Sequence, residues 1–231
     1  MFKSKVVSQP GTYHIYNQTP KEDYYSLKEN ENLSVAVLCD GAGSAEFGAV
    51  AAKIVSKLLS RYLFKNIDEI YESLPDNILK EITQLIDGKL MEYSRKKSID
   101  IHEMACTIIA CAIDQNGRCI CFHLGDGIVL RKNISDTEYE IVSSPQNGIA
   151  ENSTYLTMNC SIAEKMRFYR WRDADISELI LMTDGAYSCV FENNHGIRSR
   201  AIKNKSIIKD VSNRYKEAAD DCSCIVIQRI T

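Results

Sequence analysis

Aspartates next to glycine recur along this 231-residue chain, each beside an apolar stretch. Those that follow a strand-like apolar stretch are Asp40-Gly41, Asp126-Gly127 and Asp184-Gly185, with Asp220-Asp221 before the last such stretch and Glu22-Asp23 before an early one. Carboxylates that meet at one edge of a sheet repel each other unless cations lie among them. Oxygen ligands select hard ions such as Mg²⁺ or Mn²⁺, and a pair of these can bind a phosphate and lower the pKa of a water. Taken singly, each Asp-Gly could also be an ordinary turn.

The run from Val35 to Cys39 is the element that must deliver Asp40, and it has the apolar character of a buried strand. Gly41 and Gly43 allow a positive φ and a close approach of the backbone to a ligand. A helix is expected from Ser44 to Phe64, with Ser44 as its N-cap. Further helical patterns run from residues 73–76 to 98 and from 206 to 218.

The rest of the chain is typical of short strands separated by turns, with a hairpin signal at Asp114-Gln-Asn-Gly117. Strands are expected at 12–16, 24–27, 106–113, 118–124, 128–131, 139–142, 155–158, 165–169, 179–183 and 222–228. Because helices and strands do not alternate, a doubly wound parallel sheet is disfavoured. An α+β fold with two antiparallel sheets covered by helices fits better, as a single domain over residues 1–231.

The composition restricts the classes of partner. A net charge of -3 and a pI near 5.9 argue against a nucleic-acid-binding surface. No apolar run approaches the roughly 18 residues that span a membrane, and no signal-peptide core is present at the N-terminus. The nine cysteines fall mostly within apolar stretches, as free thiols do. A cytoplasmic protein without nucleic-acid or membrane partners is therefore expected.

Six motifs, in this order, resemble those of the metal-dependent serine/threonine phosphatases of the protein phosphatase 2C family, and most closely its compact bacterial branch. They are Gly11-Thr-Tyr-His14 with Pro20-Lys-Glu-Asp23, Asp40-Gly-Ala-Gly-Ser44, Ala105-Cys-Thr107, Leu124-Gly-Asp-Gly127, Leu181-Met-Thr-Asp-Gly185 and Asp220-Asp-Cys-Ser223. Each motif is short, but six in the family's order, over nearly the whole chain, are a specific signal. The resemblance implies a four-layer αββα sandwich with two Mn²⁺ or Mg²⁺ ions and room for a third.

The resemblance also implies roles for individual residues. Asp40 would bridge two metals, the Gly41 carbonyl would bind one of them, and Asp126 would join Asp184 at a third. The implied metal ligands are Asp23, Asp40, Gly41, Asp126, Asp184 and Asp220, with Glu22 and Asp221 as secondary candidates. The implied catalytic residues are Asp40, Asp126, Asp184 and His14.

One position departs from the family pattern. Eukaryotic members carry a histidine, proposed as a general acid, two residues after the central aspartate, and this chain has Ala42 there. The proton donor is therefore unassigned. His14 matches the opening motif of the bacterial branch and is a candidate for a role near the site. The alternative, a histidine packed within a strand, is at least as common.

The activity implied by the resemblance is hydrolysis of phosphoserine and phosphothreonine in proteins, by direct attack of a hydroxide that bridges the metals. The partners would be a phosphoprotein substrate and a cognate serine/threonine kinase pathway, and the protein would act as a monomer. One alternative is a catalytically weak regulatory module that binds a phosphoprotein. Another is a two-metal nuclease, against which the acidic pI counts.

Overall fold

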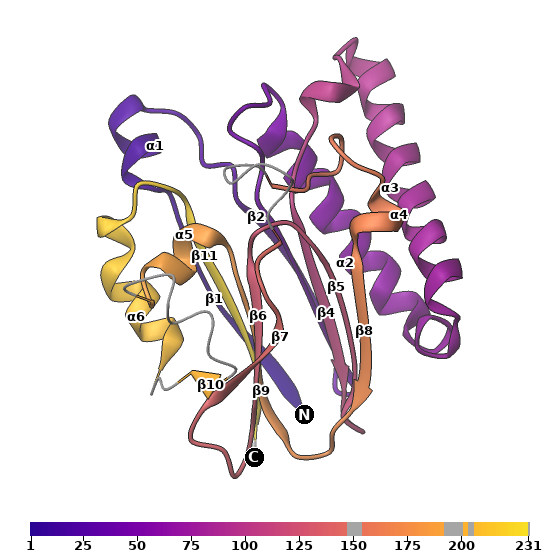
Figure 1. Cartoon of the computed structure of the whole chain (residues 1–231), viewed down its shortest axis with the longest axis vertical. Coiled ribbons are helices and arrows are strands. Elements are labelled where there is room, and N and C mark those ends of the chain that lie inside the picture. Colours follow the sequence, from indigo (N-terminus) through magenta and orange to yellow (C-terminus); the bar gives the residue numbers. More distant parts are fainter. Residues whose placement is uncertain (147–153, 192–200, 203–205, 231) are drawn as a thin grey trace.

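Two antiparallel sheets face each other in the computed structural model, which describes residues 1–146, 154–191, 201–202 and 206–230 (Figure 1). Sheet A has six strands in the order β1 (Phe2–Gln9), β11 (Cys222–Arg229), β9 (Ile176–Met182), β6 (Ile128–Asn133), β7 (Tyr139–Ser143) and β10 (Ala201–Ile202). Sheet B has five in the order β2 (Tyr24–Glu29), β3 (Leu33–Cys39), β4 (Ile108–Asp114), β5 (Arg118–Leu124) and β8 (Arg167–Arg172).

Helices cover the outer face of each sheet. Those over sheet B are α2 (Gly48–Glu72), α3 (Pro75–Lys97) and α4 (Ile162–Lys165), and those over sheet A are α5 (Asp184–Ser188) and α6 (Ile207–Arg214). A short helix α1 (Thr12–Asn17) and the 3-10 turns η1 (Ile101–Glu103) and η3 (Tyr215–Glu217) lie in connections. The predicted four-layer αββα sandwich of the α+β class is therefore confirmed.

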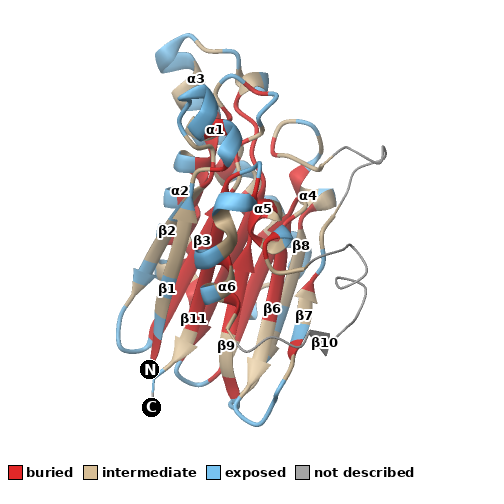
Figure 2. Ribbon diagram, turned by 90° about the vertical axis from the view of Figure 1, so that its left-hand side faces the viewer, coloured by how far each residue is buried: buried red, intermediate tan, exposed pale blue. Residues whose placement is uncertain are grey.

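Side-chain alternation along β3 explains why this strand is apolar throughout. Val35, Val37 and Cys39 join the core between sheet B and its helices. Ala36 and Leu38 join the core between the two sheets. A strand covered on both faces has no solvent side, so every residue of β3 is buried (Figure 2). The third core, between sheet A and its helices, is built in the same way from β9, β11, α5 and α6.

The expected strand at Thr12–Tyr16 is wrong, because this segment is helix α1. Its threonine, isoleucine and tyrosines favour a strand, but tertiary contacts override this local preference. The first two helical amides donate to the C-terminal segment, Thr12 to the Ala218 carbonyl and Tyr13 to the Ala219 carbonyl, each at 3.0 Å. These bonds provide acceptors for amides that a helix leaves free at its N-terminus.

Two further expectations are wrong. Helix α2 begins at Gly48, and Ser44 lies in the preceding turns and does not cap it. Residues 155–158 form turns and no strand, since the Asn159 side chain accepts from the Leu156 amide and donates to the Thr154 carbonyl. Such a local side-chain bond is a common competitor of strand pairing.

The other expected helices and strands are present, with ends shifted by a few residues. All nine cysteines are free thiols and eight of them are buried. Among the described residues, no helix combines the length and the hydropathy that crossing a bilayer requires.

Candidate functional site

Asp40 directly follows β3, and the start of the neighbouring strand holds its backbone. The Asp40 amide donates to Thr107 Oγ1 at 3.0 Å, and the Thr107 amide donates to the Asp40 carbonyl at 2.8 Å. The next amide, of Gly41, donates to the Glu22 carbonyl at 3.2 Å. Asp40 is therefore fixed to both the β4 side and the N-terminal segment before its side chain makes any contact.

Three carboxylates converge from different parts of the sandwich. One oxygen each from Asp40, Asp126 and Asp184 lies within 4.8 Å of the other two. Asp40 comes from sheet B, Asp126 from the turn that leads from sheet B to sheet A, and Asp184 from the first residue of α5 after β9. The cluster therefore forms only when the two sheets pack. The Asp126 carboxylate also accepts from the Thr154 hydroxyl, and Asp184 Oδ1 from the Gly185 amide at 2.7 Å.

Mutual repulsion in this cluster shows in the ionisation of its members. Burial raises the pKa of Asp40 well above its usual range, and the charges of Asp23, Asp184, Asp220 and Asp126 raise it further. Burial, Asp126 and Asp220 also raise the pKa of Asp184, to about 7. In the described part of the chain, no lysine or arginine is ion-paired with the three clustered carboxylates. The donor set therefore suits a divalent cation, which would relieve this repulsion.

Asp23 lies behind the cluster, immediately before β2, and is completely buried. Its Oδ2 accepts from the Thr183 hydroxyl at 3.0 Å, whereas its Oδ1 has no hydrogen-bond partner among the described residues. Burial raises its pKa well above the usual range, although hydrogen bonds from the Ser223 and Thr183 side chains oppose this. A buried carboxylate oxygen without a partner is costly, and a cation or its water would satisfy it.

Asp221 has a different role from the other acids, because backbone amides occupy both of its oxygens. Oδ1 accepts from Gly11 at 2.8 Å, and Oδ2 accepts from Glu22 at 2.5 Å and from Asp23 at 3.3 Å. The Nε2 atom of His14 lies 3.7 Å from the same Oδ2. Asp221 thus connects the C-terminal motif to both parts of the N-terminal one, and the structure does not place it in the cluster.

The neighbours of Asp221 differ in exposure. Asp220 is exposed and its Oδ1 accepts from the Asp221 amide at 2.8 Å, while its charge raises the pKa of Asp40 and Asp184. Glu22 is half-buried, and burial is the main reason that its pKa is raised. His14 is buried in α1, not in a strand, and its Nδ1 is bonded to Thr19 Oγ1 at 2.9 Å.

Two glycines allow the backbone to approach itself at the site. A Cβ on Gly41 would lie 2.5 Å from the carbonyl carbon of Gly48, and one on Gly185 would lie 2.2 Å from the Asp221 carbonyl oxygen. Neither Gly41 nor Gly43 takes a positive φ, so turn geometry does not explain them. At Gly41 and Gly185, a side chain is excluded because the first turns of α2 and α5 pack directly on the acid-bearing segments.

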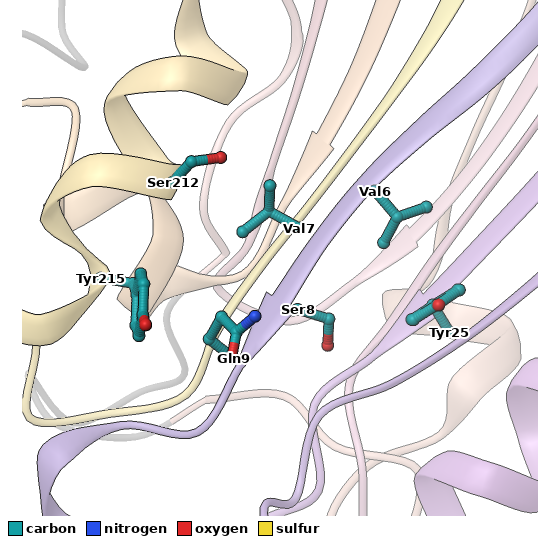
Figure 3. Close-up of a pocket in the computed structure, with 7 residues that line it drawn as sticks. All are labelled: Val6, Val7, Ser8, Gln9, Tyr25, Ser212 and Tyr215. Atoms are coloured by element: carbon teal, nitrogen blue, oxygen red, sulfur yellow. The ribbon is translucent and has the colours of Figure 1, made fainter.

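A pocket with a volume of about 270 Å³ lies to one side of this cluster, between α6 and β2 (Figure 3). Alternate residues of β1 point to its two sides: Val7 and Gln9 toward α6, and Val6 and Ser8 toward Tyr25. No carboxylate lines this pocket. Its connection to the site is indirect, since Ser8 Oγ lies 2.7 Å from Ser223 Oγ.

Sequence reasoning named the acids but missed the hydroxyl groups that orient them. Thr107 holds the Asp40 backbone, and Thr183 and Ser223 hold the Asp23 carboxylate. Each of these residues stands inside one of the motifs quoted above, and Thr183 and Ser223 lie within two residues of a candidate acid. Their position in the motifs was a usable signal, whereas nothing local indicated which acid each hydroxyl would contact.

The raised pKa of Asp184 predicts how the stability of the metal-free protein depends on pH. Since its folded pKa of about 7 exceeds the ordinary value of 3.8, the folded state binds more protons than the unfolded state between these limits. This group therefore stabilises the fold below pH 4, and that contribution is lost as the pH rises to 7. Urea unfolding in EDTA at pH 5, 6, 7 and 8 should show a decline to pH 7 that is smaller in Asp184→Asn. Equal pH dependence in both proteins would contradict the assignment.

Comparison with known protein families decides the classification. The family model described as "Protein phosphatase 2C" matches residues 10–221, which includes all of the motifs but the last residues of the terminal one. The chain belongs to the protein phosphatase 2C family. This membership confirms the resemblance seen in the sequence and supports phosphatase activity. No curated protein matches the chain in sequence.

Three solved structures share the fold over nearly the full length. A bacterial serine phosphatase has 17% identity and a TM-score of 0.72, with 99% of this chain and 98% of that chain covered. The serine/threonine phosphatase Stp1 from Staphylococcus aureus has 17% identity and a TM-score of 0.69, with 100% and 96% covered. RsbX in complex with magnesium has 13% identity and a TM-score of 0.60, with 98% and 94% covered. At these identities the similarity demonstrates the fold.

Proposed function

We propose that this protein is a divalent-cation-dependent phosphatase of phosphoserine and phosphothreonine in proteins. The observation that carries the proposal is the convergence of Asp40, Asp126 and Asp184, which form no ion pair with a lysine or arginine of the described residues. Family membership and the similarity to bacterial serine phosphatases support it. The alternative of a regulatory module is not favoured, because every acid of the motifs is present and three of them, Asp40, Asp126 and Asp184, cluster.

Each side chain has a distinct part in this proposal. Asp40, Asp184, Asp126 and Asp220, with the Gly41 carbonyl, would hold two or three Mn²⁺ or Mg²⁺ ions, and Asp23 would support them from behind. Bound there, such ions would supply charge stabilisation for a phosphate and lower the pKa of a water. Thr107 and Thr183 keep Asp40 and Asp23 in place, so that little reorganisation is needed on binding.

His14 and the secondary acids would act on the metal site indirectly. His14 faces Asp221 and Thr19, which supports a role in positioning the N-terminal motif more than one in transferring a proton. Asp221 accepts backbone amides, and Glu22 lies close enough to His14, Asp221 and Asp220 for their charges to affect its pKa. We therefore assign Asp221 to holding the backbone and leave Glu22 as a secondary ligand.

The direct test is hydrolysis of p-nitrophenyl phosphate and of a phosphoserine peptide, with Mn²⁺ added and then chelated. Both reactions should depend on the cation, and both should recover when it is restored. Single-stranded and double-stranded DNA serve as control substrates and should not be cleaved. Absence of any phosphate release at millimolar Mn²⁺ from a folded sample would refute the proposal, and DNA cleavage would favour the nuclease alternative.

Metal should raise the thermal stability of the protein. An ion that binds only the folded site stabilises it by mass action, by about 2–3 kcal/mol at a hundredfold excess over Kd. The melting temperature should therefore rise with Mn²⁺ and return to its starting value with EDTA. This readout needs no turnover, and a melting temperature that ignores both additions would argue against an acidic metal site.

The Asp126→Asn variant tests whether Asp126 has a structural or a chemical role. As a turn residue it would be replaced well by asparagine. As a ligand that helps to position a proton donor, it should affect turnover, because Ala42 supplies no histidine. We expect Asp126→Asn to keep its melting temperature and lose roughly tenfold or more in kcat. The loss should be larger for a phosphoserine peptide than for p-nitrophenyl phosphate, whose leaving group needs less protonation. Small, equal losses with a lowered melting temperature would identify a turn residue.

A further inference from the structure

Helix α1 presents apolar side chains to solvent and a polar one to the protein. Tyr13, Ile15 and Tyr16 are 64%, 55% and 87% exposed, whereas His14 is 6% exposed. With about 100° between successive residues, Tyr16 lies nearly opposite His14, and Tyr13 and Ile15 lie on either side of Tyr16. The outer side of this helix therefore carries three large apolar side chains beside the exposed Thr12 and Asn17, whereas a surface helix usually turns its apolar side chains toward the core.

This concentration differs from the rest of the described surface. Of the large apolar residues that are exposed elsewhere, Met1 and Ile230 lie side by side, with the Ile230 amide donating to the Met1 carbonyl. The others, Tyr25, Leu74, Met91 and Ile134, are scattered along the chain, as on most proteins. Three more occur within four consecutive residues of α1. Tyrosines in particular are enriched where proteins bind other proteins, because they provide a large contact area at low entropic cost. The composition of this outer side therefore fits a protein-binding surface.

The position of α1 links this surface to the acidic site. Besides the two amide bonds to residues 218 and 219, the Gly11 amide before the helix binds the Asp221 carboxylate. The exposed Asp220 stands between these anchor points. Figure 2 shows α1 exposed at the same end of the molecule as α5, which begins at Asp184. The apolar surface is thus held firmly beside the carboxylates.

We propose that Tyr13, Ile15 and Tyr16 form a docking surface for apolar residues that flank the phosphorylated residue of a protein substrate. This inference rests on the phosphatase function proposed above and adds a sequence preference to it. Because α1 is anchored on both sides of Asp220 in the sequence, a substrate segment whose phosphate reaches the carboxylates would extend over this helix. An extended chain advances about 3.3 Å per residue, so the positions three to six residues from the phosphoserine cover roughly 10–20 Å of surface on either side of the site.

Two phosphoserine peptides of equal length and charge test the preference. One carries leucine and phenylalanine three to six positions from the phosphoserine on both sides, and the other carries serine and glycine there. The wild-type protein should hydrolyse the apolar peptide with a kcat/KM roughly tenfold higher, mainly through KM. The triple variant Tyr13→Ser/Ile15→Ser/Tyr16→Ser should lose this preference. Its kcat/KM for p-nitrophenyl phosphate, which is too small to reach α1, should stay within about twofold.

The matched control is Leu74→Ser. Leu74 is 68% exposed and lies between α2 and α3, so the same kind of change occurs away from the site. This variant should keep the preference for the apolar peptide. If the triple variant does not fold, Tyr16→Ser alone replaces it, since an 87% exposed side chain contributes little to the core.

Three results would overturn the docking proposal. The first is equal hydrolysis of both peptides by the wild-type protein. The second is a loss of p-nitrophenyl phosphate hydrolysis in the triple variant as large as its loss on the apolar peptide. The third is a wild-type dimer in sedimentation that the triple variant abolishes, which would identify the surface as a contact between two copies of the chain. Failure of the phosphatase function itself is distinct, because the wild-type protein would then release no phosphate from p-nitrophenyl phosphate.

Discussion

Asp40→Asn should lower the turnover of p-nitrophenyl phosphate by about a thousandfold or more at saturating Mn²⁺. Asp40 clusters with Asp126 and Asp184, and its backbone directly after β3 is held by a hydrogen bond to Thr107. Losing a ligand charge at such a site removes several kcal/mol of transition-state stabilisation, and each 1.4 kcal/mol is about tenfold in rate. Phosphate release measured across a Mn²⁺ titration separates weak binding from slow turnover.

The same substitution should leave the metal-free fold intact or stabilise it. Burial and the repulsion from four other carboxylates raise the pKa of Asp40, so a neutral side chain relieves both costs. The melting temperature in EDTA should therefore be equal to that of the wild type or higher. Asp136→Asn, in the exposed turn between β6 and β7, is the matched control and should change neither quantity. Near-normal turnover of Asp40→Asn would show that the metal-site assignment is wrong.

Asp221→Ala should destabilise the protein by about 2–4 kcal/mol. The change removes the acceptor of three backbone amides, from Gly11, Glu22 and Asp23, and buried donors without partners cost about 1–3 kcal/mol each. Relief of repulsion between Asp221 and its acidic neighbours offsets part of this sum. Urea unfolding of the metal-free protein measures the difference without interference from bound ions.

Asp221→Asn distinguishes the role of the oxygen atoms from that of the charge. Asparagine keeps one oxygen acceptor and places an amide group, itself a donor, against the remaining backbone amides. The stability of Asp221→Asn should therefore lie between that of the wild type and that of Asp221→Ala. An alanine variant as stable as the wild type would mean that these amides find other acceptors and that Asp221 does not join the two motifs.

The part of the fold that sequence predicts is the part that local patterns determine. The strand β3 and the hairpin of β4 and β5 were visible because their apolar runs and turn residues are contiguous in the chain. The α1 segment was not, since its residues favour a strand and only amide bonds to residues 218 and 219 make it helical. Patterns within a dozen residues carry no information about such a contact.

The same division applies to the candidate site. Asp40, Asp126 and Asp184 were identifiable because each ends or follows an apolar strand and is followed by glycine. The sequence analysis placed Asp221 below Asp220 as a ligand, but it did not predict that Asp221 holds the backbone, because the two neighbours have the same side chain. Only the position of backbone amides more than a hundred residues away separates an acid that faces the cluster from one that holds the chain.

The pairing of β1 with β11 implies a late step when the chain is made on the ribosome. Gln9 pairs with Cys222, and Phe2 with Arg229, so β1 cannot pair until nearly all the remaining chain has been synthesised. At roughly 5–20 residues per second, this delay is on the order of ten seconds or more. During that time Asp23 lacks Thr183 and Ser223, and the Gly11 amide lacks Asp221. On the function proposed above, the nascent chain would therefore bind metal and turn over substrate only after β11 has left the ribosome.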